Sequence, residues 1–313
     1  MTTPSTGEQP PHLSVLYHQI IHELRPISSG RYIDATVGAG GHAWGILESS
    51  SPDGEILGLD LDPQALAIAT RRLSMYGSRV HLVESSYVNL LAEMKTLGWS
   101  SVQGIVIDLG VSSMQIDTPD RGFSFQVDGP LDMRFGPSQK TTADDLVNRL
   151  PESELADILW RYGEEMQSRR IARAILQARP LHTTRELAET ISRAVGGHKG
   201  RIHPATRSFQ ALRIAVNEEL HAIETVLPQA IEALASGGRL AVISFHSLED
   251  RLVKQYFRRE SRDCVCPPEQ PVCTCGHKAS ILEITRHPIS PEEDEIQSNP
   301  RSRSAHLRVA EKI

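Results

Sequence analysis

The chain has 313 residues, of which 39% are hydrophobic and 23% charged, and its formal net charge is −6. This composition is that of an ordinary water-soluble globular protein, and no apolar run approaches the roughly 18 residues that span a bilayer. No signal-peptide pattern opens the chain, so we expect a cytoplasmic protein with no membrane partner. Residues 1–11 are rich in Thr, Ser, Pro, Gly and Gln, and we expect them to form a disordered tail.

The charge is unevenly distributed along the chain. Between Met166 and Arg213 there are ten Arg or Lys residues and two acidic ones, so the local charge is 10 − 2 = +8 and the remainder carries −14. Segregation on this scale favours a phosphate-binding surface, and hence an RNA or DNA partner. The alternative is a solvated helix face, which is what most charge runs are.

Strand-like runs alternate with helical segments through much of the chain. Strands are expected at 31–37, 55–61, 79–84, 104–109 and 239–245, with helices at 43–50, 63–76 and 87–97. This alternation predicts an α/β fold with a parallel sheet covered on both faces. Two more strands, at 280–286 and 305–310, are expected to form an antiparallel pair that closes one sheet edge.

The fourth and fifth strands are separated by 239 − 109 = 130 positions, far more than one crossover helix needs. We expect the crossover helix at 208–235, broken in two by Pro228. The sequence therefore predicts a discontinuous sheet domain over 12–115 and 207–313. Residues 116–206 are expected to form an inserted, mainly helical domain that recognises the substrate.

A glycine-rich loop follows the first predicted strand. Gly38, Gly40 and Gly41 fall within four positions, and His42 then opens a helix. Glycine lets the backbone approach a ligand closely, and Asp60, which ends the next strand, is placed to bind ribose hydroxyls. The pattern predicts a cofactor that carries adenosine.

Two cofactor classes fit this loop, because it also loosely matches the nicotinamide fingerprint. The antiparallel strand pair and the polar loop at 108–115 favour S-adenosylmethionine instead. Its sulfonium and amino-acid groups need carboxylates and backbone amides, and Asp34, Asp60 and Asp108 end three strands. Capping of a helix or turn is the alternative for Asp34.

Seven blocks of sequence carry a resemblance to a known family: 12–16, 34–42, 108–115, 121–125 with 128–134, 203–213, 244–251 and 299–304. In them the chain resembles the bacterial 16S ribosomal RNA cytosine-N4 methyltransferases, the RsmH or MraW family. The resemblance implies a class I (Rossmann-like) S-adenosylmethionine-dependent methyltransferase. It also implies methylation of one cytidine in the decoding centre of 16S rRNA, with the small ribosomal subunit as partner.

The resemblance assigns cofactor contacts to seven residues: Gly40, Gly41, His42, Asp60, Tyr87, Asp108 and Gln115. Asp60 would hold the ribose, and Tyr87 would face the adenine. The alternatives are a helix-capping role for His42 and a core position for Tyr87.

The reaction would be a displacement in which the exocyclic amine of cytosine attacks a sulfonium methyl group. The amine lone pair is delocalised into the ring, so the enzyme must orient the amine and accept its hydrogens. We expect Asp108, or a carbonyl of the loop 110–113 aided by Ser112, to accept them. His246 could contact the base, whereas Glu249, Asp250 and Arg251 are expected to cap the next helix.

A base within folded rRNA must swing out before it is methylated. Phe123 and Phe125 are candidates to stack on it, with a place in the insert's core as the alternative for one of them. Arg134, Arg207 and Arg213 could bind phosphates. A structural salt bridge is the alternative for the last two.

All four cysteines lie in one short segment, at Cys264, Cys266, Cys273 and Cys275. Disulfides are not expected in a cytoplasmic chain. Four thiolates could instead bind a structural zinc ion, and four reduced thiols are the alternative.

Three other functions stay open at this stage. The chain could methylate another nucleic-acid amine, such as a DNA cytosine, or it could be a non-catalytic rRNA-binding or assembly factor on a methyltransferase fold. A nicotinamide oxidoreductase is the third. A homo-oligomer is compatible with the sequence.

Overall fold

The computed structural model describes residues 14–197, 203–270 and 272–313. The predicted tail at 1–11 and the first two residues of the 12–16 block lie outside them. The chain divides into two compact units, one made of residues up to Leu109 together with Val226–Ile313 and the other of Gly110–Thr225. No helix among the described residues is long and apolar enough to cross a membrane.

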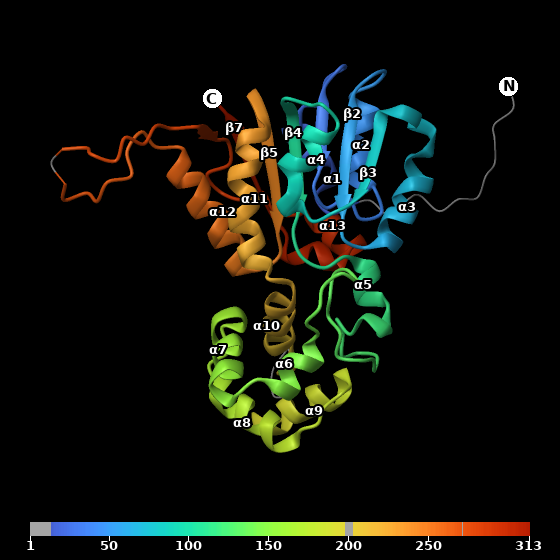
Figure 1. The fold of residues 1–313 in the computed structure, drawn as a ribbon, viewed down its shortest axis with the longest axis vertical. Coiled ribbons are helices and arrows are strands. Elements are labelled where there is room, and N and C mark those ends of the chain that lie inside the picture. The colour runs from blue at the N-terminus through green and yellow to red at the C-terminus, as the bar shows by residue number, and fades with distance from the viewer. Residues whose placement is uncertain (1–13, 198–202, 271) are drawn as a thin grey trace, which may run out of the picture. The chain divides into compact units, whose positions relative to one another are not determined.

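The first unit is built on a seven-stranded sheet in the order β3-β2-β1-β4-β5-β7-β6 (Figure 1). Strands β1 to β5 are parallel, whereas β7 runs antiparallel to both β5 and β6. Class I methyltransferase-like (Rossmann-like) α/β architecture with an antiparallel edge pair is therefore confirmed. The strands are β1 Arg31–Asp34, β2 Glu55–Asp60, β3 Val80–Glu84, β4 Val102–Asp108, β5 Leu234–Ser244, β6 Ile281–Glu283 and β7 His306–Lys312.

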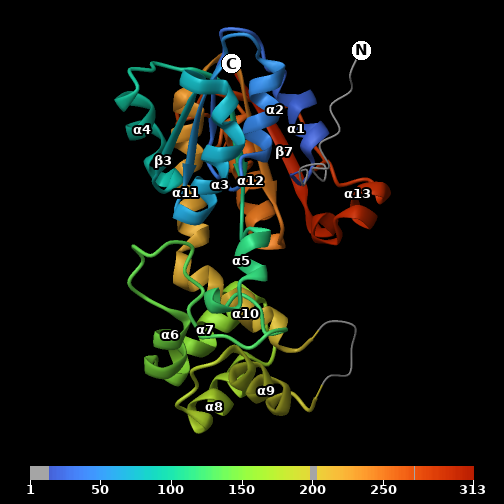
Figure 2. The ribbon, with the colours of Figure 1, turned by 90° about the vertical axis from the view of Figure 1, so that its right-hand side faces the viewer.

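Helices cover both faces of this sheet because its central strands are almost wholly apolar. Figure 2 shows α4 and α11 on one side and α1 and α2 on the other.

The helices of this unit are α1 Tyr17–Leu24, α2 Gly41–Ser49, α3 Pro63–Leu73, α4 Leu90–Thr96, α12 Ser247–Glu260 and α13 Glu293–Ser298. Helix α11 Glu219–Ala233 contains the boundary between the two units. Short 3₁₀ helices are η1 Ser74–Arg79, η2 Tyr87–Asn89 and η4 Pro300–Ser304.

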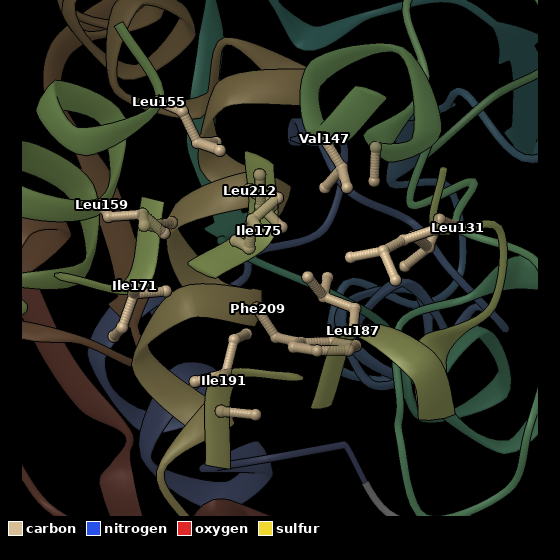
Figure 3. Packing of buried hydrophobic residues seen from close by; sticks show 14 of the residues in the cluster. Leu131, Val147, Leu155, Leu159, Ile171, Ile175, Leu187, Ile191, Phe209 and Leu212 are labelled. Carbon is tan, nitrogen blue, oxygen red and sulfur yellow. The ribbon is translucent and has the colours of Figure 1, made fainter. Parts of the chain in front are cut away.

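The second unit is mainly helical and has its own apolar core. Figure 3 shows side chains from several of its helices meeting there, among them Leu159, Ile175, Leu187 and Phe209. Its helices are α5 Ser113–Asp117, α6 Ala143–Arg149, α7 Glu152–Gly163, α8 Ser168–Ala178, α9 Thr184–Ala194 and α10 Ala205–Asn217, with the 3₁₀ helix η3 Pro119–Arg121. Helix α10 belongs to this unit because it packs closely on α7, where a Cβ on Gly163 would lie 2.6 Å from the Arg207 carbonyl oxygen.

The predicted break of the crossover helix at Pro228 is wrong. The chain breaks ten residues earlier, at Glu218, whose φ of 50° is in the left-handed region and ends α10. Pro228 lies inside α11, which continues past it. The predicted helix at 63–76 also ends early, at Leu73, where the chain continues as the 3₁₀ helix η1.

Candidate active site

Three aspartates meet at the carboxyl edge of the parallel strands. Asp34 ends β1 and lies between Gly58 of β2 and Val106 of β4, while Asp60 and Asp108 end those neighbouring strands. Thr36 joins two of these strand ends, because its hydroxyl accepts the Asp108 amide at 2.7 Å. The edge at which open α/β sheets bind ligands thus carries three carboxyl groups.

The Asp60 carboxylate holds the glycine loop. Its Oδ2 accepts the Gly38 amide at 2.8 Å and its Oδ1 accepts the Asp62 amide at 2.9 Å. Burial raises the pKa of Asp60, and these two amides partly oppose the rise. A carboxylate has about four acceptor sites, so two occupied ones leave capacity for ribose hydroxyls.

Local backbone conformation and packing require glycine at positions 40 and 41. Gly40 has a φ of 78° and is the N-cap of α2, a conformation that L side chains rarely adopt. A Cβ on Gly41 would lie 2.0 Å from Ser14 Oγ. The close approach at Gly41 is therefore to the chain itself, which is a requirement that the sequence pattern does not distinguish from ligand contact.

His42 is buried in α2, and its side chain does not form the helix cap that was the alternative to a cofactor contact. Its Nε2 lies 2.9 Å from the Val15 carbonyl oxygen, which ties α2 to the segment before α1. Burial lowers the pKa of His42 to about 4, so the imidazole is neutral at physiological pH. The N-cap is Gly40, and no side chain caps this helix.

Asp34 and Asp108 each carry an enclosed carboxyl oxygen without a hydrogen-bond partner among the described residues, Oδ2 and Oδ1 respectively. Burial raises the pKa of Asp34 to about 7, with the Asp60 charge adding to the rise. Burial, followed by the charges of Asp34 and Glu249, raises the pKa of Asp108 well above its ordinary value. An enclosed polar atom without a partner costs free energy, so the pair suits a ligand that brings positive charge or hydrogen-bond donors.

His246 and Glu249 form the N-terminal cap of α12. Glu249 is fully buried and its Oε2 accepts the Phe245 amide at 2.8 Å, while the His246 side chain accepts the Glu249 amide. The expected capping by Glu249 is confirmed. Asp250 instead pairs with Arg308 of β7 at 2.6 and 3.0 Å, and this ion pair connects α12 to the antiparallel part of the sheet.

Tyr87 begins η2 directly after β3 and is half-buried. Ser86 caps that turn, and the Ser85 amide donates to the Asp60 carbonyl oxygen at 3.0 Å. Tyr87 therefore lies at the same strand edge as Asp60.

In the second unit, Ser112 and Gln115 form a capping box at the start of α5. Ser112 Oγ accepts the Gln115 amide at 3.2 Å, and Gln115 Oε1 accepts the Ser112 amide at 3.0 Å. Gln115 Nε2 also donates to the Phe135 carbonyl oxygen at 3.3 Å. Both side chains thus shape the polar loop, and the Ser-x-x-Gln spacing is a signal that could have shown this.

The two candidate stacking residues pack against the core of the second unit. Phe123 stacks on Phe135 at a centroid distance of 5.8 Å, and Phe125 lies 4.9 Å from the Phe209 ring, edge to face. Phe125 also lies 4.6 Å from the ring of His203. This arrangement corresponds to the core alternative for both.

Two of the three candidate phosphate-binding arginines are already paired. Arg134 forms a two-pronged pair with Asp132, both contacts being 2.7 Å. Arg213 does the same with Glu219 at 2.8 and 2.9 Å, and the Glu219 side chain is only 3% exposed. Only Arg207 of the three is exposed, with one long contact of 3.5 Å to the Glu164 carbonyl oxygen among its described contacts.

A second feature of this unit is a hollow of about 1090 Å³ between α7 and the start of α8. Two large apolar side chains line it and remain exposed, Trp160 at 51% and Met166 at 76%. Arg169 and Arg170 line it as well. Both arginines belong to the basic segment between Met166 and Arg213, whereas no sequence pattern marks Trp160 as exposed.

A sequence model of the MraW methylase family matches residues 9–313. The chain belongs to the MraW methylase family. Relatives called ribosomal RNA small subunit methyltransferase H are 54% identical in Dehalococcoides mccartyi, over 97% of this chain and 87% of the relative, and 49% identical in Heliobacterium modesticaldum, over 96% and 98%. The resemblance that the sequence blocks predict is confirmed, and this MraW methylase family member is a methyltransferase.

Solved structures similar to this family member include an rRNA methylase from Streptococcus thermophilus, with 12% identity, a TM-score of 0.42 and 99% of each chain covered. TrmN from Thermus thermophilus has 12% identity and a TM-score of 0.44, over 95% of this chain and 48% of TrmN.

Proposed function

We propose that the protein methylates N4 of one cytidine in the decoding centre of 16S rRNA, with S-adenosylmethionine as methyl donor and the small ribosomal subunit as substrate. The methyl-donor part rests on the enclosed carboxyl oxygens of Asp34 and Asp108, which have no hydrogen-bond partner in the described part of the chain. Support for the rRNA part comes from relatives about half identical over nearly the whole chain, whose names specify the small ribosomal subunit RNA.

Asp60, Asp34 and Asp108 are the residues we propose to hold the methyl donor. S-adenosylmethionine supplies, when bound, a methyl group on a positively charged sulfur. Asp60 accepts ribose hydroxyls while it keeps the Gly38 amide in place, and Tyr87 faces the adenine from the next strand end. Gly40, Gly41 and His42 contribute indirectly, since the packing around the two glycines and the His42 contact shape the loop that follows β1. Gln115 holds the polar loop that follows Asp108 in the chain.

Asp108 is proposed to accept hydrogens from the cytosine amine. In the unliganded protein its carboxyl group favours the protonated form, because burial and the charges of Asp34 and Glu249 oppose ionisation. A cation bound beside it favours the carboxylate, which is the form that can accept a hydrogen. Asp108 thus becomes a competent acceptor when donor and base are both present. Ser112 and His246 are proposed to keep the surrounding loops in position through their caps.

The rRNA contact is proposed on the second unit, at the hollow whose lining includes Trp160, Met166, Arg169 and Arg170 beside the carboxylates of Glu152 and Asp157. Arg207 is proposed as a further phosphate contact. Guanidinium groups bind phosphates, and an exposed aromatic ring offers a stacking surface to an unpaired base. We therefore assign substrate binding to exposed side chains, in preference to Phe123, Phe125, Arg134 and Arg213.

A methyl-transfer assay tests the function. Small ribosomal subunits from cells without this protein are incubated with it and labelled S-adenosylmethionine, and the rRNA nucleosides are identified by mass spectrometry. We expect N4-methylcytidine at one position. Binding without transfer would instead indicate an assembly factor, and transfer only to naked DNA would indicate a different substrate class. Binding of NAD with no binding of S-adenosylhomocysteine would indicate an oxidoreductase.

The Asp108→Asn variant tests the assigned acceptor. We expect turnover at saturating donor to fall by about 10²–10⁴-fold, the usual contribution of acid–base catalysis. The matched control is Glu84→Gln, an exposed carboxylate that ends β3 beside Asp60, and it should retain full turnover. Wild-type turnover of Asp108→Asn would remove Asp108 from this role.

A further inference from the structure

Four cysteine sulfurs converge in the loop at residues 261–280, between α12 and β6. The ligand atoms of Cys264, Cys266, Cys273 and Cys275 all lie within 4.8 Å of one another. Cys275 Sγ is 3.6 Å from Cys273 Sγ and 3.9 Å from Cys264 Sγ. Two Cys-x-Cys pairs that are seven residues apart in sequence therefore meet in space.

The fold brings the two pairs together from both ends of the loop. The Ser280 amide donates to the Glu260 carbonyl oxygen at 2.9 Å, and His277 Nε2 lies 3.1 Å from the Arg259 carbonyl oxygen. Nearer the sulfurs, the Ala279 amide donates to Asp263 Oδ1 at 3.3 Å. These contacts bring Cys273 and Cys275 back to the C-terminal end of α12, close to Cys264 and Cys266.

The sulfur separations match metal coordination better than disulfide bonding. A disulfide places its sulfurs about 2.05 Å apart, and all four cysteines are free. Four thiolates around zinc at about 2.3 Å in a tetrahedron have sulfurs roughly 3.8 Å apart. The two measured separations lie on either side of this value.

Backbone amides already point at two of the sulfurs. The Cys266 amide donates to Cys264 Sγ at 3.4 Å, and the His277 amide donates to Cys275 Sγ at 3.5 Å. Donors of this kind favour the thiolate form that binds metal, and the four sulfurs stay within 4.8 Å of one another although the loop is exposed to solvent. A tetrahedral set of four sulfurs is a donor set that selects zinc or an iron–sulfur centre.

We propose that Cys264, Cys266, Cys273 and Cys275 bind one structural zinc ion that closes the loop between α12 and β6. Helix α12 begins directly after the carboxyl end of β5, and its 14 residues carry the chain about 21 Å away from that edge before the loop starts. Figure 1 shows the loop extending beyond the C-terminal end of α12. The ion thus fixes a loop remote from the aspartates and takes no part in methyl transfer.

Metal analysis of the full chain, purified without added zinc or chelator, tests the proposal. We expect one zinc per chain in the wild type and a loss of most of it in the Cys264→Ser and Cys273→Ser variants. The matched control is Thr274→Ser, which lies between two of the ligands and should keep its zinc. Absence of stoichiometric metal in the wild type overturns the proposal, and so does stoichiometric iron in place of zinc.

Thiol accessibility in the wild type provides a second measurement that does not depend on the variants folding. We expect four thiols that resist alkylation in the native protein and react once a chelator has removed the ion. Four thiols that react freely from the start, or two disulfides detected by mass, would overturn the proposal. The affinity for S-adenosylhomocysteine should change less than twofold on chelation, which separates this site from the proposed methyl-donor site.

Discussion

The Gly38 amide donates a hydrogen bond of 2.8 Å to Asp60 Oδ2, so the carboxylate that ends β2 holds the loop that leaves β1. The same side chain accepts the Asp62 amide with its other oxygen. One carboxylate therefore sets the path of two loops at the sheet edge. This arrangement explains why an acidic residue is needed there before any ligand binds.

The Asp60→Asn variant should lose both stability and donor affinity. Its amide NH₂ group would face one of the two backbone N–H donors, leaving that donor unpaired. We expect a loss of about 1–3 kcal/mol in the free energy of unfolding, measured with urea. Binding of S-adenosylhomocysteine, measured by calorimetry, should weaken at least tenfold. Glu84→Gln is the control for both measurements, and equal behaviour of the two variants would contradict the assignment.

Asp34 should make the protein less stable as pH rises. Its pKa is about 7 in the folded protein, against an ordinary value of 3.8. Between these values the folded state binds the proton more tightly than the unfolded state does, so the contribution of Asp34 to stability is most favourable below pH 4 and is lost as the pH rises through 7. Asp34→Asn cannot ionise and should gain stability relative to the wild type between pH 5 and pH 8. A difference in urea midpoint that is independent of pH would show that Asp34 is not responsible.

The same carboxyl groups should make donor binding depend on pH and on ligand charge. A sulfonium cation favours ionised Asp34 and Asp108, whereas S-adenosylhomocysteine lacks that charge. We expect affinity for S-adenosylmethionine to rise relative to that for S-adenosylhomocysteine between pH 6 and pH 8. Calorimetry in buffers of different ionisation enthalpy should detect proton release only with the methylated ligand. Equal proton release with both ligands would contradict this coupling.

The parts of the fold that the sequence predicts are those set by local pattern. Apolar runs of strand length predicted the parallel sheet, and the acidic residues at their ends predicted that Asp34, Asp60 and Asp108 would meet at one edge. No residue pattern predicts the helix break at Glu218. Glutamate does not favour the left-handed backbone conformation that ends α10 there. Proline rules pointed to Pro228, yet α11 accommodates it.

Tertiary packing decided the side-chain roles that the sequence left open. Whether Phe125 is exposed depends on His203 and Phe209, which lie some eighty residues away in the chain (203 − 125 = 78 and 209 − 125 = 84). Whether Arg213 is available to bind phosphate depends on its pairing with Glu219, which follows the unpredicted helix break at Glu218. By contrast, the cap formed by Ser112 and Gln115 was readable from their spacing.

The ion pair between Arg213 and Glu219 should be important for stability. Because Glu219 is buried, Arg213→Ala removes the guanidinium group that pairs with its carboxylate, and we expect a loss of about 3–5 kcal/mol in the free energy of unfolding. The exposed Arg207→Ala serves as the control and should cost less than about 0.5 kcal/mol. The double variant Arg213→Ala/Glu219→Ala should lose less than the sum of the two single variants. Strict additivity would contradict a direct pair.

The exposed ring of Trp160 should contribute to rRNA binding and little to stability. Stacking of a base on an aromatic side chain contributes about 1–3 kcal/mol, so Trp160→Ala should weaken binding to small ribosomal subunits roughly tenfold. Arg169→Ala/Arg170→Ala should weaken it too, with a shallower dependence on salt concentration because fewer phosphates are neutralised. The matched control is Met75→Ala, an apolar side chain that is 75% exposed in η1 of the first unit. Thermal denaturation should leave all three variants close to the wild type. If Trp160→Ala and Met75→Ala bound the subunits equally well, the hollow between α7 and α8 would not be an rRNA contact.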